Sequence, residues 1–217
     1  MTVATITRSD DHRYTVGDRQ FPGVTTIIGS VIRKPGLERW MGNVGNAEAK
    51  RVREEAADHG TLVHALASLV VQGVPSIPMG GEDAPAQAQL DAFTDWYEQF
   101  VAEVYAVELM VAHPGYQYAG QLDFLLRLKR HKAPTLIDVK SGKAVYAEHR
   151  YQTSAYREAV RLQGIDGVDL KNCRRGVLHV PREATGPARF YEHTRHQSDF
   201  QGFLSCLFLF HDLKRGL

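Results

Sequence analysis

The chain has 217 residues, 43% of them hydrophobic and 24% charged, and a formal net charge of +1. We expect a single domain over residues 1–217, because this length suffices for one sizeable core and is short for two. No stretch approaches the roughly 20 apolar residues of a membrane helix, and the first residues lack the layout of a signal peptide, so we expect a soluble cytoplasmic protein with no membrane partner.

The first 104 residues are expected to form a hairpin followed by helices. The hairpin covers residues 13–21, with its turn at Gly17 and Asp18. Hydrophobic periodicity predicts helices over residues 37–44, 47–58, 61–71 and 86–104. The proline- and glycine-rich segment 73–85 is expected to be a surface loop between two of these helices. In the last helix, Phe93, Trp96 and Phe100 recur at helical spacing, which predicts a face that packs on a core.

Residues 105–217 are expected to form a sheet with its covering helices. Alternating patterns predict strands over residues 105–112, 117–129, 135–140, 176–181 and 189–193, with a helix over 147–162. The final helix is predicted to begin with a capping box formed by Ser198 and Gln201. The side chains expected to point inward from it are Phe200, Phe203, Leu204, Leu207 and Phe208. This order predicts an α/β fold, a mixed central β-sheet flanked by helices, with a helical N-terminal elaboration.

The period of two along a strand predicts which polar side chains share a space. It assigns Leu122 and Phe124 to the apolar face of their strand and Asp123 to the opposite face. On the next strand, the same period puts Asp138 and Lys140 on one face. We therefore expect these charged groups to lie close together.

The neighbouring elements add further polar groups to this space. Gln152 and Tyr156 are four residues apart, so they share one face of the predicted helix, and Glu108 can face the group from the preceding strand. Two carboxylates about 4 Å apart repel by roughly 4 kcal/mol at an effective dielectric near 20. A site that gathers Asp123 and Asp138 therefore usually holds a cation or a shared proton.

Five motifs occur in a characteristic order along the chain. They are Val24-Thr-Thr-Ile followed by Leu37-Glu-Arg-Trp40, then Gly60-Thr-Leu-Val-His64, Gly120-x-x-Asp123, Asp138-Val-Lys140 and Gln152-x-x-x-Tyr156. Each alone is weak, but the set in this order resembles the PD-(D/E)XK nuclease superfamily, and within it the RecB-like exonuclease branch with its phage-type and mitochondrial genome maintenance members. The resemblance implies a restriction-endonuclease-like core.

The resemblance also implies a metal site. His64, Asp123, Asp138 and the backbone carbonyl of Val139 would ligate Mg²⁺ or Mn²⁺, and Glu108 fits the place of a further ligand in some relatives. These cations take oxygen ligands and keep some of their waters, which leaves positions open for a phosphate. A histidine ligand would favour Mn²⁺ relative to Mg²⁺.

The same resemblance implies roles in catalysis beside Asp123 and Asp138. Lys140 would orient or activate the attacking water, and Gln152 and Tyr156 would position the phosphate or the lysine. Simpler interpretations stay open on the residues alone: His64 as a core histidine, the two aspartates as residues that cap turns with Lys140 as an ion-pair partner, and Gln152 and Tyr156 as ordinary helix residues.

Basic and aromatic residues near this group indicate a nucleic-acid interface. Lys143 and Arg150 flank the predicted site, and Arg39 and Trp40 lie on a predicted helix, where the indole would be a platform for an unpaired base. A solvated charged surface is the alternative for each of them.

Together these features predict a metal-dependent DNA exonuclease that prefers single strands or ends. A structure-specific endonuclease of the same fold and a non-catalytic nucleic-acid-binding module are the alternatives. The two isolated cysteines, Cys173 and Cys206, exclude the iron–sulfur cluster that some relatives carry. The chain also has no Walker-type phosphate loop, so a helicase or recombination protein that acts with it would be a separate partner.

Overall fold

The computed structural model describes residues 5–9, 13–74, 81, 84–182 and 186–215. A small antiparallel sheet comes first, formed by β1 (Ile6–Arg8), β2 (Tyr14–Val16) and β3 (Arg19–Phe21). The predicted hairpin is therefore confirmed, with β1 added to its edge. Most of the predicted loop over 73–85 lies outside the described residues.

The central sheet has five strands in the order β4-β5-β6-β7-β8. Their bounds are β4 (Val101–His113), β5 (Tyr118–Leu128), β6 (Pro134–Lys140), β7 (Arg174–His179) and β8 (Arg189–Glu192). Only β6 and β7 run parallel, and α5 (His149–Gln163) connects them; the other neighbours are antiparallel. The predicted mixed sheet flanked by helices is confirmed.

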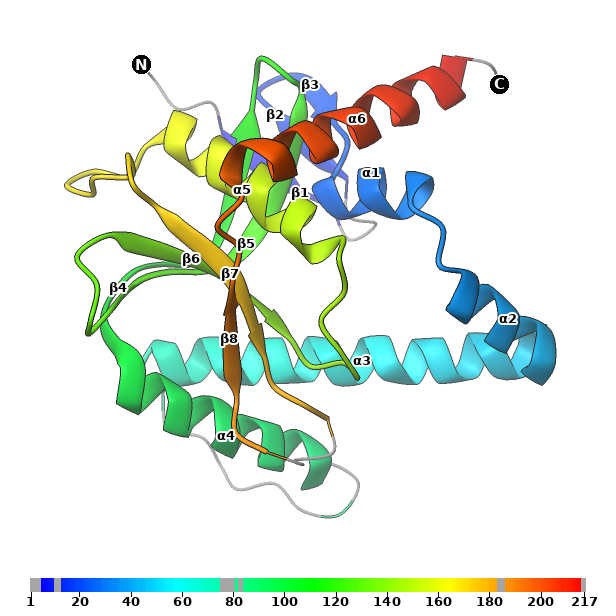
Figure 1. Cartoon of the computed structure of the whole chain (residues 1–217), viewed down its shortest axis with the longest axis horizontal. Helices are drawn as coiled ribbons and strands as arrows, with labels where there is room; N and C mark the ends of the chain where they lie inside the picture. The colour runs from blue at the N-terminus through cyan, green and yellow to red at the C-terminus, as the bar shows by residue number, and fades with distance from the viewer. Residues whose placement is uncertain (1–4, 10–12, 75–80, 82–83, 183–185, 216–217) are drawn as a thin grey trace.

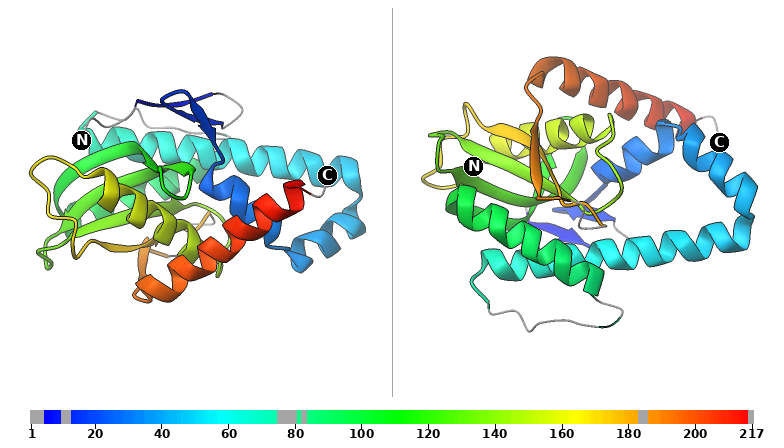
Figure 2. Two further views of the ribbon diagram at one scale, coloured as in Figure 1. Left: turned by 90° about the horizontal axis from the view of Figure 1, so that it is seen from above. Right: turned by 60° about the horizontal axis from the view of Figure 1, so that its bottom comes forward.

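Helices cover both faces of this sheet (Figure 1). On one face α1 (Val24–Val31), α5 and α6 (His196–Arg215) share a hydrophobic core with the strands. On the other face α3 (Asn46–Val71) and α4 (Ala84–Phe100) enclose a second core. The views in Figure 2 show α3 running past the edge of the sheet to α2 (Pro35–Val44). Among the described residues, no helix combines the length and the apolar character needed to cross a bilayer.

Several predicted element boundaries are wrong. The two helices expected over 47–58 and 61–71 are one helix, α3, which continues through His59 and Gly60. The helix expected over 86–104 ends at Phe100, because Val101 already pairs with Leu128 in the sheet. The helix α1 was not predicted at all.

The prediction for the last helix is partly wrong. Ser198 lies inside α6 instead of capping it, and its hydroxyl donates to the carbonyl of Arg195 at 3.4 Å. Phe208, expected to point inward, is 69% exposed. The buried face consists of Phe203, Cys206, Leu207 and Phe210, which recur at helical spacing.

Candidate active site

An open cleft of about 540 Å³ lies where α3, α5 and the small sheet meet strands β4, β5 and β6. Its lining contains the predicted residues His64, Glu108, Asp123, Asp138, Lys140, Gln152 and Tyr156. The structure thus brings together side chains from five elements that are separated by up to 92 residues along the chain.

The end of β6 places Asp138 and Lys140 in this cleft. As predicted, they share a face, while Ile137 and Val139 pack in the core on the other side of the sheet. Lys140 Nζ lies 2.6 Å from Asp138 Oδ2, and Asp138 is only 2% exposed. The carboxylate is therefore held in a nearly water-free position with an ammonium group beside it.

Asp123 on β5 connects this pair to α3. Its Oδ2 accepts a hydrogen bond from the backbone N–H of Val139 at 2.6 Å, and its Oδ1 lies 3.4 Å from Nδ1 of His64. The prediction that Leu122 shares a face with Phe124 is wrong, because Leu122 packs in the core with α5 whereas Phe124 packs in the core with α3 and α4. The regular alternation of side chains between the two faces of the sheet is therefore broken in β5 next to Asp123.

Glu108 reaches the cleft from an irregular position in β4. Because Val107 pairs with Phe124 and Leu109 with Leu122, Glu108 lies opposite Asp123. Its φ of 51° is in the left-handed region, which is uncommon for a residue with a side chain.

The Glu108 carboxylate accepts hydrogen bonds from Ser68 Oγ at 3.1 Å and from Gln121 Nε2 at 2.7 Å. These two contacts fix both of its oxygens. The strained backbone and these two donors hold the carboxylate against α3.

Three of these side chains fit a divalent cation. One ligand atom each from His64, Glu108 and Asp123 lies within 4.8 Å of the others. Two carboxylates and an imidazole are donors that suit Mn²⁺ and are acceptable to Mg²⁺. Asp138 stands outside this group of three, and its buried Oδ2 is paired with Lys140 Nζ at 2.6 Å. The donor set is compatible with a divalent metal.

Burial and charge shift the pKa values of the site. The charge of Asp123 raises the pKa of His64 to about 9. Burial by itself would raise the pKa of Asp123, but the charge of His64 and then Lys140 outweigh it and lower that pKa. Burial raises the pKa of Asp138, and burial together with the charge of Asp123 raises that of Glu108. Burial would lower the pKa of Lys140, but Asp138 and Asp123 raise it.

Gln152 and Tyr156 close the cleft from α5. Gln152 Nε2 donates to Asp138 Oδ1 at 2.8 Å and to the Tyr156 hydroxyl at 3.3 Å. Gly120 on β5 lets the Tyr156 ring approach, because a Cβ atom there would overlap that ring. Burial raises the pKa of Tyr156 well above its usual value, so it remains a neutral hydroxyl.

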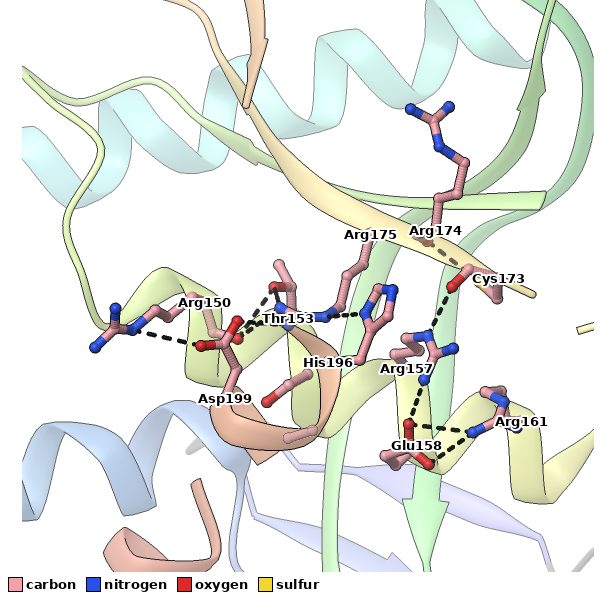
Figure 3. Close-up of polar contacts among 12 residues, drawn as sticks. Arg150, Thr153, Arg157, Glu158, Arg161, Cys173, Arg174, Arg175, His196 and Asp199 are labelled. Carbon is pink, nitrogen blue, oxygen red and sulfur yellow. Dashed lines mark hydrogen bonds and ion pairs between the residues drawn. The ribbon is translucent and has the colours of Figure 1, made fainter. Parts of the chain in front are cut away.

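A buried network holds the start of α5 in position (Figure 3). Arg175 on β7 is fully buried, and its Nη1 donates to the carbonyl of Arg150 and to the hydroxyl of Thr153. Its Nη2 lies 2.6 Å from Asp199 Oδ2 on α6. Arg150 and Thr153 flank Gln152 in the sequence, so this network also fixes the residue that contacts Asp138.

The four residues predicted to bind nucleic acid lie at different places relative to the cleft. Trp40 and Lys143 line a second groove beside the cleft. Arg150 lines neither space; its guanidinium lies over the Tyr151 ring and 3.7 Å from Asp199. Arg39 is exposed on α2 and also lines neither.

Several residues of the cleft belong to none of the motifs found in the sequence. Ser68 lies one helical turn after His64, so helical spacing alone could have identified it. Arg8 and Tyr14 reach the cleft from the small sheet, and no sequence signal indicated this. Arg8 Nη1 donates to Gln121 Oε1 at 2.5 Å, which connects the small sheet to the side chain that holds Glu108.

Comparison with known proteins gives a distant structural likeness. No protein-family model matches the chain, and no curated protein matches it. A crystal structure of a protein from Eubacterium rectale, described as a "putative exonuclease", is similar with a TM-score of 0.50 and 12% sequence identity. The likeness covers 73% of this chain and 68% of the other. At this identity the likeness shows that the two proteins share a fold.

Proposed function

We propose that this protein is a metal-dependent DNA exonuclease of the RecB-like PD-(D/E)XK type, acting on single strands or ends. One observation carries the proposal: His64, Glu108 and Asp123 present ligand atoms within 4.8 Å of one another in a cleft that also contains Lys140. A carboxylate-rich site with an adjacent ammonium is suited to binding a cation and a phosphate together. The motif order and the fold of the similar structure support the same conclusion.

A divalent cation bound by these residues would supply a Lewis acid that polarises a phosphoryl oxygen. The residues of the chain supply the rest. Lys140, as an ammonium group, offsets negative charge that develops on a phosphate in the cleft. Gln152 donates a hydrogen bond to Oδ1 of Asp138. The other oxygen, Oδ2, is directed at Lys140 and fixes the position of the Lys140 ammonium.

A cleavage assay tests this proposal. End-labelled single-stranded and double-stranded DNA, linear and circular, is incubated with the protein and Mg²⁺ or Mn²⁺, with EDTA as the control. We expect shortening of linear single strands that needs the metal and spares circles. Cleavage of circles would indicate an endonuclease, and absence of cleavage with every substrate and metal would contradict the proposal.

Two variants make the assay specific to the site. Asp138→Asn should abolish cleavage, whereas Asp166→Asn, which removes an exposed carboxylate outside the cleft, should leave it unchanged. Lys140→Ala should abolish turnover while Mn²⁺ affinity, measured by calorimetry, stays within a few-fold of the wild type. Equal activity of Asp138→Asn and the wild type would assign cleavage to another site or to a contaminant.

A further inference from the structure

A second groove lies beside the cleft, formed by α2, α3 and the loop that follows β6. Its volume is about 380 Å³, within the range of small-ligand pockets. The two spaces meet where α3 lies against this loop: a Cβ atom at Gly60 would be 3.5 Å from Ser141 Oγ. Gly60 lines the cleft, while Ser141, directly after Lys140, lines the groove.

The wall between the two spaces is held by a buried side chain. Gln89 on α4 is fully buried and donates to the carbonyls of Ser141 and Val180, and it also bonds to the His59 ring at 2.5 Å. These partners belong to α3, to the loop after β6 and to the residue that follows β7. Gln89 therefore links three segments at the boundary between the cleft and the groove. The groove is therefore a built feature with a defined position relative to Lys140.

The charge of the groove is complementary to a polyanion. Arg53, Lys143 and Arg182 line it, and among the residues that the structure describes no aspartate or glutamate belongs to its lining. All three cationic residues are exposed. The adjoining cleft carries both signs of charge, with Glu108, Asp123 and Asp138 beside Arg8 and Lys140.

The groove also presents two aromatic side chains. Trp40 from α2 and Tyr146 from the loop line it, and Tyr146 is 51% exposed. Lys34 Nζ lies 6.0 Å from the centre of the Tyr146 ring and is paired with Glu148 at 3.0 Å, so the cations available to a phosphate are those that line the groove. A half-exposed tyrosine and a tryptophan beside cationic groups form a surface on which a nucleobase stacks while its phosphate stays near the charges.

We propose that this groove binds one unpaired nucleotide of a DNA strand whose backbone continues into the cleft. The base would lie on Trp40 and Tyr146, and the phosphates would contact Arg53 and Lys143. A base in a duplex cannot enter without unpairing, so the groove selects single strands or frayed ends. This inference rests on the proposed function, because it assigns the substrate class of the same site.

Binding without cleavage tests the groove directly. The probe is a fluorescein-labelled 12-nucleotide oligothymidine, with a blunt hairpin duplex for comparison, both titrated in EDTA and followed by anisotropy. Tyr146→Ala should weaken binding of the single strand roughly tenfold, as loss of one stacking contact does, and leave binding of the duplex unchanged. The matched control is Tyr116→Ala, which removes a tyrosine that is 45% exposed outside the groove.

Charge is tested with two arginines of the same helix. Arg53 lines the groove, whereas Arg51 is paired with Glu48 and Glu55 and lines neither space. Arg53→Gln should weaken binding of the single strand several-fold more than Arg51→Gln. Equal losses would show that only the general charge of α3 matters and would overturn the proposed groove.

Tryptophan fluorescence gives an independent measurement. The chain has two tryptophans, and Trp96 is buried in the core with α4 while Trp40 lines the groove. Unlabelled oligothymidine should quench the wild-type emission, and the quenching should disappear in Trp40→Phe. Quenching that persists in Trp40→Phe, or no quenching at saturation, would overturn the proposal.

These outcomes are separable from those of the cleavage assay. If the wild type cleaves DNA but Tyr146→Ala binds the single strand normally, the proposed nucleotide site in the groove is wrong and the nuclease function stands. If the wild type binds the single strand through Tyr146 and Trp40 but cleaves nothing, the groove stands and the nuclease function fails. Absence of single-stranded DNA binding by the wild type would contradict the proposed nucleotide site in the groove.

Discussion

The substitution Asp199→Asn tests whether α6 holds the start of α5 in position. Arg175 is fully buried and Asp199 is 4% exposed, with 2.6 Å between their charged groups. Asparagine keeps the shape of the side chain but removes the charge, so the guanidinium stays buried without its counter-charge. Breaking a buried pair from one side in this way costs about 3–5 kcal/mol.

For a chain of this length, that loss corresponds to a fall in melting temperature of about 6–20 °C. Calorimetry or circular dichroism measures it. Glu48→Gln is the matched control, because Glu48 forms an exposed ion pair with Arg51, and surface pairs contribute little. The double variant Arg175→Met/Asp199→Leu should recover much of the stability, since it leaves no unpaired buried charge.

The same substitution has a consequence for catalysis. Arg175 fixes Arg150 and Thr153, which flank Gln152, so disorder in this network displaces the amide that contacts Asp138. Cleavage by Asp199→Asn at a temperature well below its melting point should therefore be slower than that of the wild type. A melting temperature within about 2 °C of the wild type would refute the reasoning.

Three further predictions concern pH, packing and metal binding. Burial lowers the pKa of His193 to about 4. The folded chain therefore keeps this imidazole neutral, whereas the unfolded chain takes up a proton below about pH 6.5. Stability should fall as the pH drops from about 6.5 to 4, and urea unfolding of His193→Gln should show a shallower fall. Gly120→Ala should cost about 1–3 kcal/mol in unfolding free energy and slow cleavage, because the new Cβ overlaps the Tyr156 ring. Mn²⁺ at about 100 times its Kd should stabilise the wild type by about 2.7 kcal/mol in thermal unfolding and should not stabilise Asp123→Asn.

Each of these has a clear contrary result. Identical pH profiles for His193→Gln and the wild type would mean that this imidazole titrates as freely as in the unfolded chain. Wild-type stability in Gly120→Ala would mean that Tyr156 moves without cost. Equal stabilisation of Asp123→Asn by Mn²⁺ would place the ion away from this carboxylate.

Strand periodicity predicted much of the site, because the alternation on β6 is regular. Asp138 and Lys140 share the cleft as expected, and Ile137 and Val139 pack behind them. Periodicity failed on β5, where Leu122 turns to the other core. This change of faces lies opposite Glu108, whose φ of 51° interrupts the regular geometry of the neighbouring strand, and the sequence of β5 does not record it.

The helix break predicted within α3 is absent. Hydrophobic periodicity predicted one helix ending at residue 58 and another beginning at residue 61, with His59 and Gly60 between them. In the structure the helix continues through both residues, and a Cβ atom at Gly60 would be 3.5 Å from Ser141 Oγ, an ordinary van der Waals contact. Only the folded structure shows that the loop after β6 contacts α3 at this point.

The parts of the site that depend on distant segments could not be predicted. Strand alternation predicted that Glu108 faces the site, but it did not indicate the φ of 51° that this residue adopts inside a long strand. The burial of Arg175 on β7 depends on Asp199, which is 24 residues away on α6. No pattern within either segment indicates a buried arginine, since arginine is usually exposed.

The location of a bound cation tests the central claim most directly. Crystals soaked in Mn²⁺ and measured at a wavelength with strong manganese anomalous scattering reveal the ion without assumptions about activity. We predict an anomalous peak at about 2.1 Å from an Asp123 oxygen, with His64 and Glu108 as further ligands. No peak in the cleft at a Mn²⁺ concentration that supports cleavage, or a peak only elsewhere on the surface, would contradict the account.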